Sequence, residues 1–219
     1  MPGLNHVTRG DEPLTFPLSP TVSVTKVSVG TMDNNTYVLV GAGGVLLVDA
    51  AADPDTLIAV LGDRSLSTIV TTHRHRDHWQ ALSVLDRTGA RLVAGTPDAE
   101  AVATEAGVRR PDGVWDGDTV PLGSEHLDVV GLVGHTPGSV VLAYRGPDGP
   151  THLFTGDSLF PGGAGRTTNS EDFASLMNDL EAKIFAVYDD DTVVHPGHGD
   201  DTTLGDERPH LQEWRERGW

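Results

Sequence analysis

The chain has 219 residues, of which 37% are hydrophobic, a formal net charge of −17 and no cysteine. This length favours a single core, so we predict one domain over residues 1–219, with a lead-in over 1–20 and a docked C-terminal tail over 200–219. The negative charge argues against nucleic acid or an anionic membrane as a partner. The lack of cysteine excludes disulfides and thiolate metal ligands. Because no apolar stretch resembles a membrane span or a signal peptide, we expect a cytoplasmic protein.

The first half of the chain predicts strands followed by alternating strands and helices. Strands are expected at 22–29, where Val22, Val24 and Lys26 alternate with Ser23, Thr25 and Val27, and then at 36–40, 45–48, 68–71 and 91–94. A helix should begin with Asp53 as its N-cap and Pro54 at its first position, end at Gly62, and bury Leu57, Ile58 and Leu61. Further helices are expected from about His78 to Gly89 and after Thr96-Pro97.

The second half returns to strands and closes with a helix and a strand. Strands are predicted at 127–132, 139–144, 152–155 and 192–195. A helix capped by Ser170 should bury Phe173, Leu176, Met177, Leu180 and Ile184, and Trp214 and Trp219 should dock the tail. Mixed sheets covered by helices on their outer faces pack such elements economically, so the expected fold class is α/β (α+β).

The segment His73-Arg74-His75-Arg76-Asp77-His78 carries the strongest functional signal. Residues two apart in extended backbone point the same way, so His73 and His75 can converge on one ion. Asp77 and His78 lie where the chain turns into a helix and can face a second point nearby. Asp77 alone could be a simple N-cap, but four ligand-type side chains within six residues favour a metal site.

Three later residues occupy loops rich in glycine. His135 lies in a Gly-His-Thr-Pro-Gly turn, Asp157 follows the strand at 152–155, and His198 follows the strand at 192–195. Glycine-flanked loops at strand ends let a side chain reach a shared ion without steric penalty. Among the other histidines, His152 is expected to be an ordinary strand residue.

Four ordered motifs resemble the metallo-β-lactamase superfamily, specifically its glyoxalase II-like branch. They are His-x-His-x-Asp-His at 73–78, Gly-His-Thr-Pro-Gly-Ser at 134–139, Thr-Gly-Asp-Ser-Leu-Phe at 155–160 and Pro-Gly-His-Gly at 196–199. The resemblance covers nearly the whole chain. It implies an αββα four-layer sandwich of two mixed β-sheets, with the metal site at one edge of the sheets.

The resemblance also implies two divalent metal ions as cofactors. The first ion would be held by His73, His75 and His135, and the second by Asp77, His78 and His198, with Asp157 bridging both. Zinc is expected, although nitrogen and oxygen ligands also admit iron or manganese. Asp49 matches a position that supports the site from behind the ligands, and His195, directly before Pro196, is a further supporting candidate.

A binuclear site of this kind predicts hydrolysis. Two ions about 3.5–4 Å apart can share a water and lower its pKa toward neutrality, so the nucleophile is a metal-bound hydroxide. Asp77 would orient this nucleophile and is the expected catalytic residue. No separate general acid is evident for an amide leaving group, whereas a thiolate leaves unassisted, so a small-molecule thioester is the expected substrate.

The tail departs from that of larger glyoxalase II enzymes, whose helical extension grips glutathione. This chain resembles the short bacterial type. Its 13 arginines and two lysines, Lys26 and Lys183, suggest a high-GC bacterium. Either an S-acylglutathione or an S-acylmycothiol is therefore expected. Arg76 and Arg166 lie near the motifs and could meet a substrate carboxylate or simply be solvated.

The same motifs leave other functions open. A persulfide dioxygenase with a single iron is the main alternative, and lactone or phosphodiester hydrolysis is also compatible with the metal core. A flavodiiron-type redox module is disfavoured because those proteins typically have Glu where this chain has His75. A non-catalytic protein on the same fold is disfavoured because all seven ligand positions are intact. The sequence does not indicate an oligomeric state.

Overall fold

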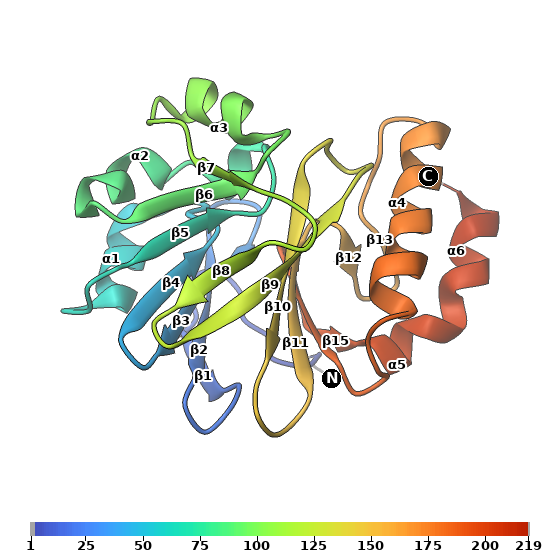
Figure 1. The fold of residues 1–219 in the computed structure, drawn as a ribbon, viewed down its shortest axis with the longest axis horizontal. Helices are drawn as coiled ribbons and strands as arrows, with labels where there is room; N and C mark the ends of the chain where they lie inside the picture. Colours follow the sequence, from blue (N-terminus) through green and yellow to red (C-terminus); the bar gives the residue numbers. More distant parts are fainter. Residues whose placement is uncertain (1–2, 219) are drawn as a thin grey trace.

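Two mixed β-sheets face each other in the computed structural model, which describes residues 3–218 (Figure 1). The first sheet runs in the order β1 to β7, antiparallel up to β4 and parallel beyond it. Its strands are β1 (Leu14–Pro17), β2 (Ser23–Val29), β3 (Asn34–Gly41), β4 (Gly44–Val48), β5 (Thr68–Thr71), β6 (Arg91–Gly95) and β7 (Asp112–Val114).

The second sheet has the order β15-β14-β11-β10-β9-β8, in which only the pair of β11 and β14 is parallel. Its strands are β8 (Thr119–Leu122), β9 (Glu125–Leu132), β10 (Ser139–Arg145), β11 (Thr151–Gly156), β14 (Val193–Pro196) and β15 (Thr202–Thr203). A short hairpin pairs β12 (Leu159–Phe160) with β13 (Gly163–Ala164).

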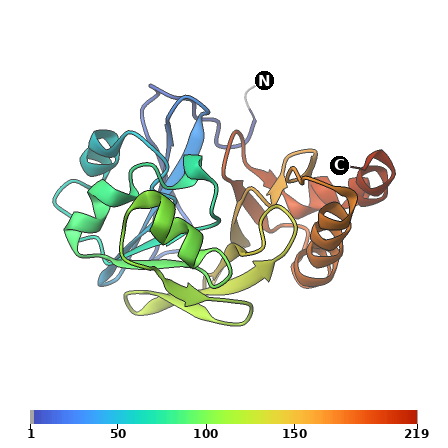
Figure 2. The ribbon, with the colours of Figure 1, turned by 90° about the horizontal axis from the view of Figure 1, so that it is seen from above.

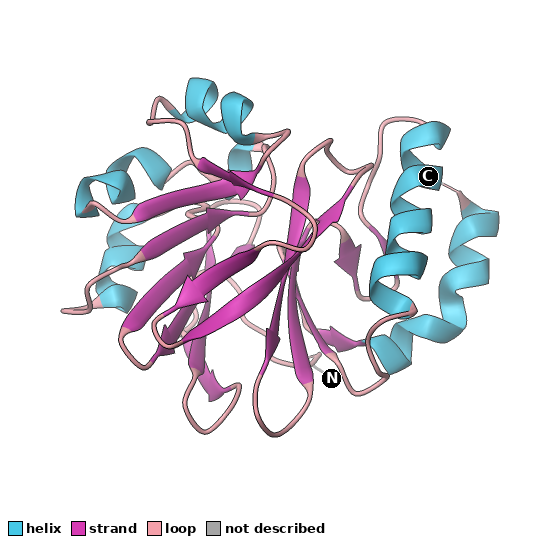
Figure 3. Ribbon diagram, in the orientation of Figure 1, coloured by secondary structure: helices cyan, strands magenta, loops and turns pink. Residues whose placement is uncertain are grey.

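Helices cover the outer face of each sheet (Figures 1 and 3). On the first sheet these are α1 (Pro54–Leu61), α2 (Leu82–Leu85) and α3 (Ala99–Ala106), and on the second α4 (Ser170–Asp179), α5 (Leu204–Glu207) and α6 (Leu211–Arg217). The view from above shows helix, sheet, sheet and helix in succession (Figure 2). This arrangement confirms the expected four-layer αββα sandwich.

Three buried clusters of apolar side chains hold the layers together. The central cluster lies between the sheets and joins Val24 and Leu39 of the first sheet to Leu142 and Phe154 of the second. A second cluster packs α1 and α2 onto the first sheet, and a third packs α4 and α6 onto the second. The strict alternation predicted for β2 fits this packing, because Val24 faces the central cluster and Val27 the outer one.

The helix expected from about His78 to Gly89 is broken. A 3₁₀ turn (Arg76–His78) is followed by the single-turn α2 and a second 3₁₀ turn (Asp86–Thr88). Trp79, Leu82 and Leu85 are buried as predicted. The Trp79 Nε1–H donates to the Arg74 carbonyl at 2.8 Å, which ties the segment to the metal-ligand motif instead of to a continuous helix.

The caps of two helices also differ from the prediction. Asp53 has a positive φ of 45° and does not cap α1 with its side chain, which instead accepts a hydrogen bond from Gly30 N. Ile58 on this helix is exposed rather than buried. At α4 the cap is Asn169, whose side chain accepts from Glu171 N and Asp172 N, and Ser170 is the first helical residue.

The C-terminal segment packs onto the second sheet. Trp214 is 1% exposed and meets the Phe185 ring edge-on at 6.2 Å. Trp219, also expected to dock, lies outside the described residues. In the described part of the chain, no helix is long and apolar enough to cross a membrane.

Candidate metal centre

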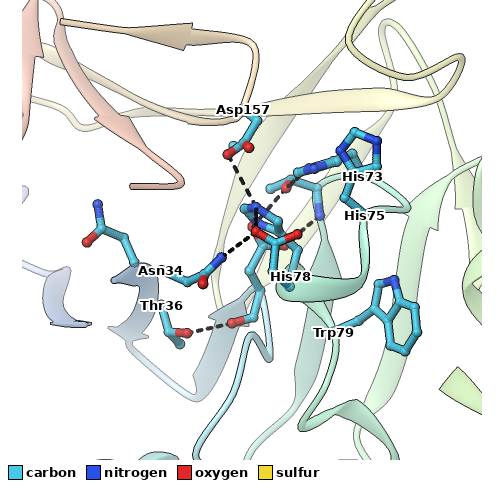
Figure 4. A network of polar contacts seen from close by, with 12 residues as sticks. Asn34, Thr36, His73, His75, His78, Trp79 and Asp157 are labelled. Carbon is cyan, nitrogen blue, oxygen red and sulfur yellow. Dashed lines mark hydrogen bonds and ion pairs between the residues drawn. The ribbon is translucent and has the colours of Figure 1, made fainter. Parts of the chain in front are cut away.

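Loops from both sheets meet at one edge of the sandwich. His73 to His78 follow β5, and Asp49 follows β4, its parallel neighbour. On the other sheet, Asp157 follows β11 and His198 follows β14, which are also parallel neighbours. Because the ends of neighbouring parallel strands lie at the same sheet edge, residues far apart in the sequence come together there. Figure 4 shows His73, His75 and His78 gathered from one loop with Asp157 facing them.

Three imidazoles converge at the first candidate position. His135 Nε2 lies 3.2 Å from His73 Nε2 and 2.9 Å from His75 Nδ1. At most one proton can lie between any two of these ring nitrogens, so the three cannot all be satisfied by hydrogen bonds to one another. A shared cation would bind all three. This is the trio predicted for the first ion.

The second candidate position joins Asp77, His78 and His198. Asp77 Oδ2 lies 3.5 Å from His78 Nε2 and 3.3 Å from His198 Nε2. Asp157 stands between the two positions, with one oxygen 3.3 Å from His78 Nε2 and the other 3.7 Å from His135 Nε2. The structure therefore brings together all seven residues predicted as ligands.

Fixed acceptors hold three of these histidines in one tautomer. The Nδ1–H groups face the Asp49 carboxylate for His78 (2.8 Å), the Arg166 carbonyl for His135 (2.7 Å) and the Met32 carbonyl for His198 (3.0 Å). A donating Nδ1 makes Nε2 the nitrogen that can bind a metal, and a second partner of this kind is the usual support of a metal-binding histidine.

Asp49 organises the loop that carries the first motif. Its buried carboxylate accepts from Thr72 N at 2.7 Å, from Thr72 Oγ1 at 2.8 Å and from His78 Nδ1 at 2.8 Å. Two of these bonds fix the backbone just before His73 and the third orients His78. Asp49 thus lies where a supporting residue behind the ligands would be expected.

One further observation indicates that these residues could hold a metal ion. The buried atoms His78 Nε2 and Asp157 Oδ1 have no hydrogen-bond partner, although they lie 3.3 Å apart. Leaving a buried polar atom unpaired is costly, and a cation between them would satisfy both. The set of imidazole and carboxylate donors suits zinc, iron or manganese.

Burial sets the protonation of the first trio. It lowers the pKa of His73, His75 and His135, in each case as the largest effect. These imidazoles are therefore neutral at pH 7, which is the form that binds a metal.

At the second position, attraction between opposite charges outweighs burial in setting the pKa values. Burial raises the pKa of Asp77 and Asp157, but His78 and His198 outweigh it and lower both below their usual range. Burial also lowers the pKa of His198, whereas hydrogen bonds to Asp157 and Asp77 raise it to about 10. A cation here would replace protons that the carboxylates hold on the histidines.

The other predicted residues have different surroundings. Arg166 is exposed, but its side chain lines a cavity of about 360 Å³ together with His75, His135, Thr167 and Thr168. Arg76 is exposed, and no side-chain hydrogen bond or ion pair joins it to the rest of residues 3–218. The ring nitrogens of His195, the other supporting candidate, bond Asp201 at 2.6 Å and His152 at 3.0 Å and contact none of the seven predicted ligands directly.

Two residues that support the site were missed from the sequence. Buried Asp98 accepts from Arg74 N at 3.0 Å and from Thr136 Oγ1 at 2.6 Å, so it links the loops of two ligand motifs. Asn34 Nδ2 donates to Asp77 Oδ2 at 2.9 Å (Figure 4). Asp98 directly follows Thr96-Pro97, which predicts the start of a helix, and Asn34 lies at the start of a strand. Neither residue has a local pattern that indicates its partner.

Two mixed sheets lie between helical layers, and a cluster of histidine and aspartate side chains that could hold metal ions lies at one edge. Residues 29–198 match the family model of the metallo-beta-lactamase superfamily. The chain belongs to this superfamily, which confirms the resemblance seen in its motifs.

Known relatives include enzymes and proteins without an assigned activity. A hydroxyacylglutathione hydrolase of Anaeromyxobacter dehalogenans is 36% identical over 76% of this chain, and the match spans only 61% of that enzyme's length. An uncharacterised protein of Mycobacterium leprae is 34% identical over 84% of this chain and 95% of its own length.

Solved structures share the fold. The protein TTHA1623, solved in a di-iron-bound form, is 31% identical with a TM-score of 0.63, covering 84% of this chain and 96% of its own. The B3 metallo-β-lactamase BLEG-1 is 26% identical with a TM-score of 0.73, covering 87% and 99%. At 24% identity and a TM-score of 0.71, ETHE1 of Myxococcus xanthus, covering 88% and 84%, shares the fold alone.

Proposed function

We propose that this protein is a binuclear metallo-thioesterase that hydrolyses the thioester of an acylated small thiol, of the S-acylglutathione or S-acylmycothiol type. The convergence of seven ligand-type side chains on two adjacent positions carries the proposal, because each position collects three donors and Asp157 reaches both. The hydroxyacylglutathione hydrolases among the relatives support the choice of a thioester.

In this proposal His73, His75 and His135 hold the first ion, and Asp77, His78 and His198 hold the second. When bound, the two ions supply the Lewis acidity that activates water and polarises a carbonyl. Zinc is the first expectation, and the di-iron form of TTHA1623 is a precedent for iron in a relative.

Protein groups around this centre allow Asp77 to act as a base. Asp77 is ionised at neutral pH, and the Asn34 amide donates to its Oδ2 at 2.9 Å. With one oxygen held in this way, the Asp77 carboxylate can accept a proton from the attacking water and keep it oriented. Asp77 is therefore the proposed catalytic residue.

The leaving group favours a thioester over an amide. A thiol with a pKa of about 8.5 departs as a thiolate without a proton donor, whereas an amine needs one. The cavity of about 360 Å³ beside His75 and His135 is the proposed place for the acyl-thiol. Arg166 at its wall is the proposed contact for an anionic group of the substrate.

Metal content and hydrolysis should be measured on the same samples. The metal-loaded protein is expected to bind two ions and to release thiol from one or more members of a panel that includes S-lactoylglutathione and an S-acylmycothiol. Chelation should abolish the activity, and added Zn²⁺, Fe²⁺ or Mn²⁺ should restore it. Full thioesterase activity in a metal-depleted sample would refute the mechanism.

Substitution of a ligand gives a second test. His75→Ala should lower the bound metal and reduce turnover at least about 100-fold, because it removes a donor from the first position. His126→Ala is the matched control, since the His126 side chain is 63% exposed on β9. One bound iron, with oxygen uptake on glutathione persulfide and no thioester hydrolysis, would instead identify a persulfide dioxygenase.

A further inference from the structure

A buried ion pair lies beside the metal centre and has no part in the proposed chemistry. The side chains of Lys26 and Asp201 are both 0% exposed, and Lys26 Nζ lies 2.8 Å from Asp201 Oδ1. Burying a lysine is costly unless its charge is paired and its protons are bonded. Because a buried lysine is so costly, its ammonium group is expected to hold parts of the structure together.

Lys26 reaches the turn that carries His198. It follows Val24 on the face of β2 that points between the sheets, and it lies in register with Tyr37 of β3. Its Nζ also donates to the Gly199 carbonyl at 2.8 Å. The ammonium group therefore joins the first sheet to the backbone of a turn on the second.

Two neighbours of Lys26 hold the same turn, residues 196–199. The Asn35 amide donates to the Pro196 carbonyl at 3.0 Å and to the Gly199 carbonyl at 2.9 Å. The Tyr37 hydroxyl donates to the Pro196 carbonyl at 2.7 Å. Lys26, Asn35 and Tyr37, here called the turn clamp, thus place four hydrogen bonds on the two carbonyls that flank Gly197 and His198.

Asp201 keeps the clamp electrically neutral. Its second oxygen accepts from His195 Nδ1 at 2.6 Å and from Asn5 Nδ2 at 2.8 Å. A carboxylate with these partners stays ionised beside Lys26, so the lysine charge is balanced and the Gly199 bond is charge-assisted.

We propose that the turn clamp positions His198 and thereby sets the affinity for the second ion. His198 Nε2 must lie close to Asp77 Oδ2, now at 3.3 Å, and the other contacts of its ring are the Met32 carbonyl at Nδ1 and, at Nε2, Asn34 Nδ2 at 3.3 Å and Asp157 Oδ2 at 3.6 Å. Within residues 3–218, no clamp side chain bonds any member of the first trio, so the effect should be confined to one ion. The inference rests on the proposed binuclear centre.

The test is a competitive Zn²⁺ titration that resolves two affinities. Lys26→Met should weaken the second ion by about 10- to 100-fold and leave the first within about twofold, as expected when support behind a ligand is lost. Lys183→Met is the matched control, because Lys183 Nζ likewise donates to a backbone carbonyl, that of Gly131, and pairs with Asp179, but far from the turn. It should change neither affinity.

Two more variants separate positioning from stability. Lys26→Met with Asp201→Asn removes both buried charges, so it should recover thermal stability but not the second-ion affinity, because Gly199 still lacks its donor. Tyr37→Phe keeps the buried ring and removes one bond to Pro196. It should weaken the second ion several-fold even if the lysine variants fail to fold.

The outcomes distinguish this inference from the proposed function. A wild-type protein that binds fewer than two Zn²⁺ ions contradicts the proposed function and removes the basis of the inference. A wild-type protein that binds two, with Lys26→Met and Tyr37→Phe variants that bind both equally well or lose both in parallel, contradicts the inference alone. Recovery of the second-ion affinity in the double variant also overturns it, because the charge balance and not the Gly199 bond would then be responsible.

Discussion

Single side chains behind the ligands decide how this centre is built. Asp49 is the clearest case, since one carboxylate serves both the backbone before His73 and the ring of His78. It also follows a buried strand at a positive φ of 59°, a conformation that aspartate tolerates better than most residues. A strand-end aspartate is common, so the residue type alone does not indicate this role; the family resemblance suggested it, and its hydrogen-bond partners fit it.

Asp49→Asn is expected to weaken metal binding by about 10- to 100-fold, because an amide cannot accept all three hydrogen bonds and leaves the tautomer of His78 unfixed. Equilibrium titration with Zn²⁺ measures the change. Asp63→Asn removes the same charge from an exposed loop and should bind zinc like the wild type. Equal affinities in the two variants would show that Asp49 does not support the centre.

Gly197 is a second residue whose role is local. A Cβ at this position would collide with Asp157 Oδ1 and would meet His78 Cε1 at 2.7 Å. Gly197→Ala should therefore push the Asp157 carboxylate aside and reduce metal content and turnover together, as measured by elemental analysis and thioester hydrolysis.

Gly43→Ala, in the turn between β3 and β4, is the control for Gly197→Ala. Its Cβ meets open space but its φ is 81°, so the change should cost ~1 kcal/mol of stability and leave the metal content as in the wild type. If Gly197→Ala retained full metal content, the close approach of Gly197 to Asp157 would have no bearing on the site.

At the scale of elements, the sequence indicated the N-cap of α4 only to within one residue. Asn169 and Ser170 are both good capping residues, and the choice between them depends on where the chain leaves the loop before α4. In the structure Asn169 Oδ1 accepts from Glu171 N at 3.0 Å and from Asp172 N at 2.9 Å.

Asn169→Ala should therefore lower the free energy of unfolding by ~1 kcal/mol. Ser170→Ala should change it by much less, because its hydroxyl caps nothing and alanine is a good helix former. Thermal or urea unfolding of the two variants measures the difference. A larger loss with Ser170→Ala would contradict the observed cap.

The break in the segment after His75 is also an effect at this scale. The apolar spacing of Trp79, Leu82 and Leu85 is helical, and each side chain is buried. The backbone is nevertheless split into short turns, because Gln80 N and Ala81 N bond the carbonyls of Ala51 and Ala50 instead of those one turn earlier. Tertiary hydrogen bonds overrode the local preference.

For the whole molecule, burial of His152 in the second sheet contributes to the response of stability to acid. Burial, with a smaller effect from His195, lowers the pKa of His152 from about 6.5 to about 4. Below pH 6.5 the unfolded chain therefore binds a proton that the folded chain does not, so stability is full above pH 6.5 and falls as the pH drops toward 4. This single group accounts for a loss of ~3 kcal/mol over that range.

His152→Phe should reduce the slope of unfolding stability against pH between pH 6.5 and 4 by the share that His152 contributes, because the aromatic replacement keeps the stack on His195 but cannot titrate. Urea unfolding at a series of pH values measures the slope. His126→Phe replaces an exposed histidine and should leave the slope unchanged. An unchanged slope in the His152 variant would contradict the assignment.

The longer strands, the helices α1, α3 and α4, and the four metal-ligand motifs could be read from the sequence, whereas short strands such as β1, β7, β8 and β15 were not predicted. Strand alternation and glycine turns are local signals, and the spacing of His73, His75, Asp77 and His78 places them on one short loop whatever the rest of the chain does. The motifs around His135, Asp157 and His198 were likewise recognisable one by one, and their resemblance to a known family supplied the ligand set.

Apart from Asp49, which the family resemblance indicated, only the tertiary structure revealed the polar residues that lie behind the predicted ligands. Asp98, Asn34, Lys26 and Asp201 are polar residues without a distinctive local pattern, and the partners of Lys26 lie 173 and 175 positions away in the chain. A periodic pattern indicates that a side chain faces the interior, but not what it meets there. Hydrogen bonding and charge pairing depend on atoms a few ångströms apart, and only the packing of one sheet against the other brings these atoms together.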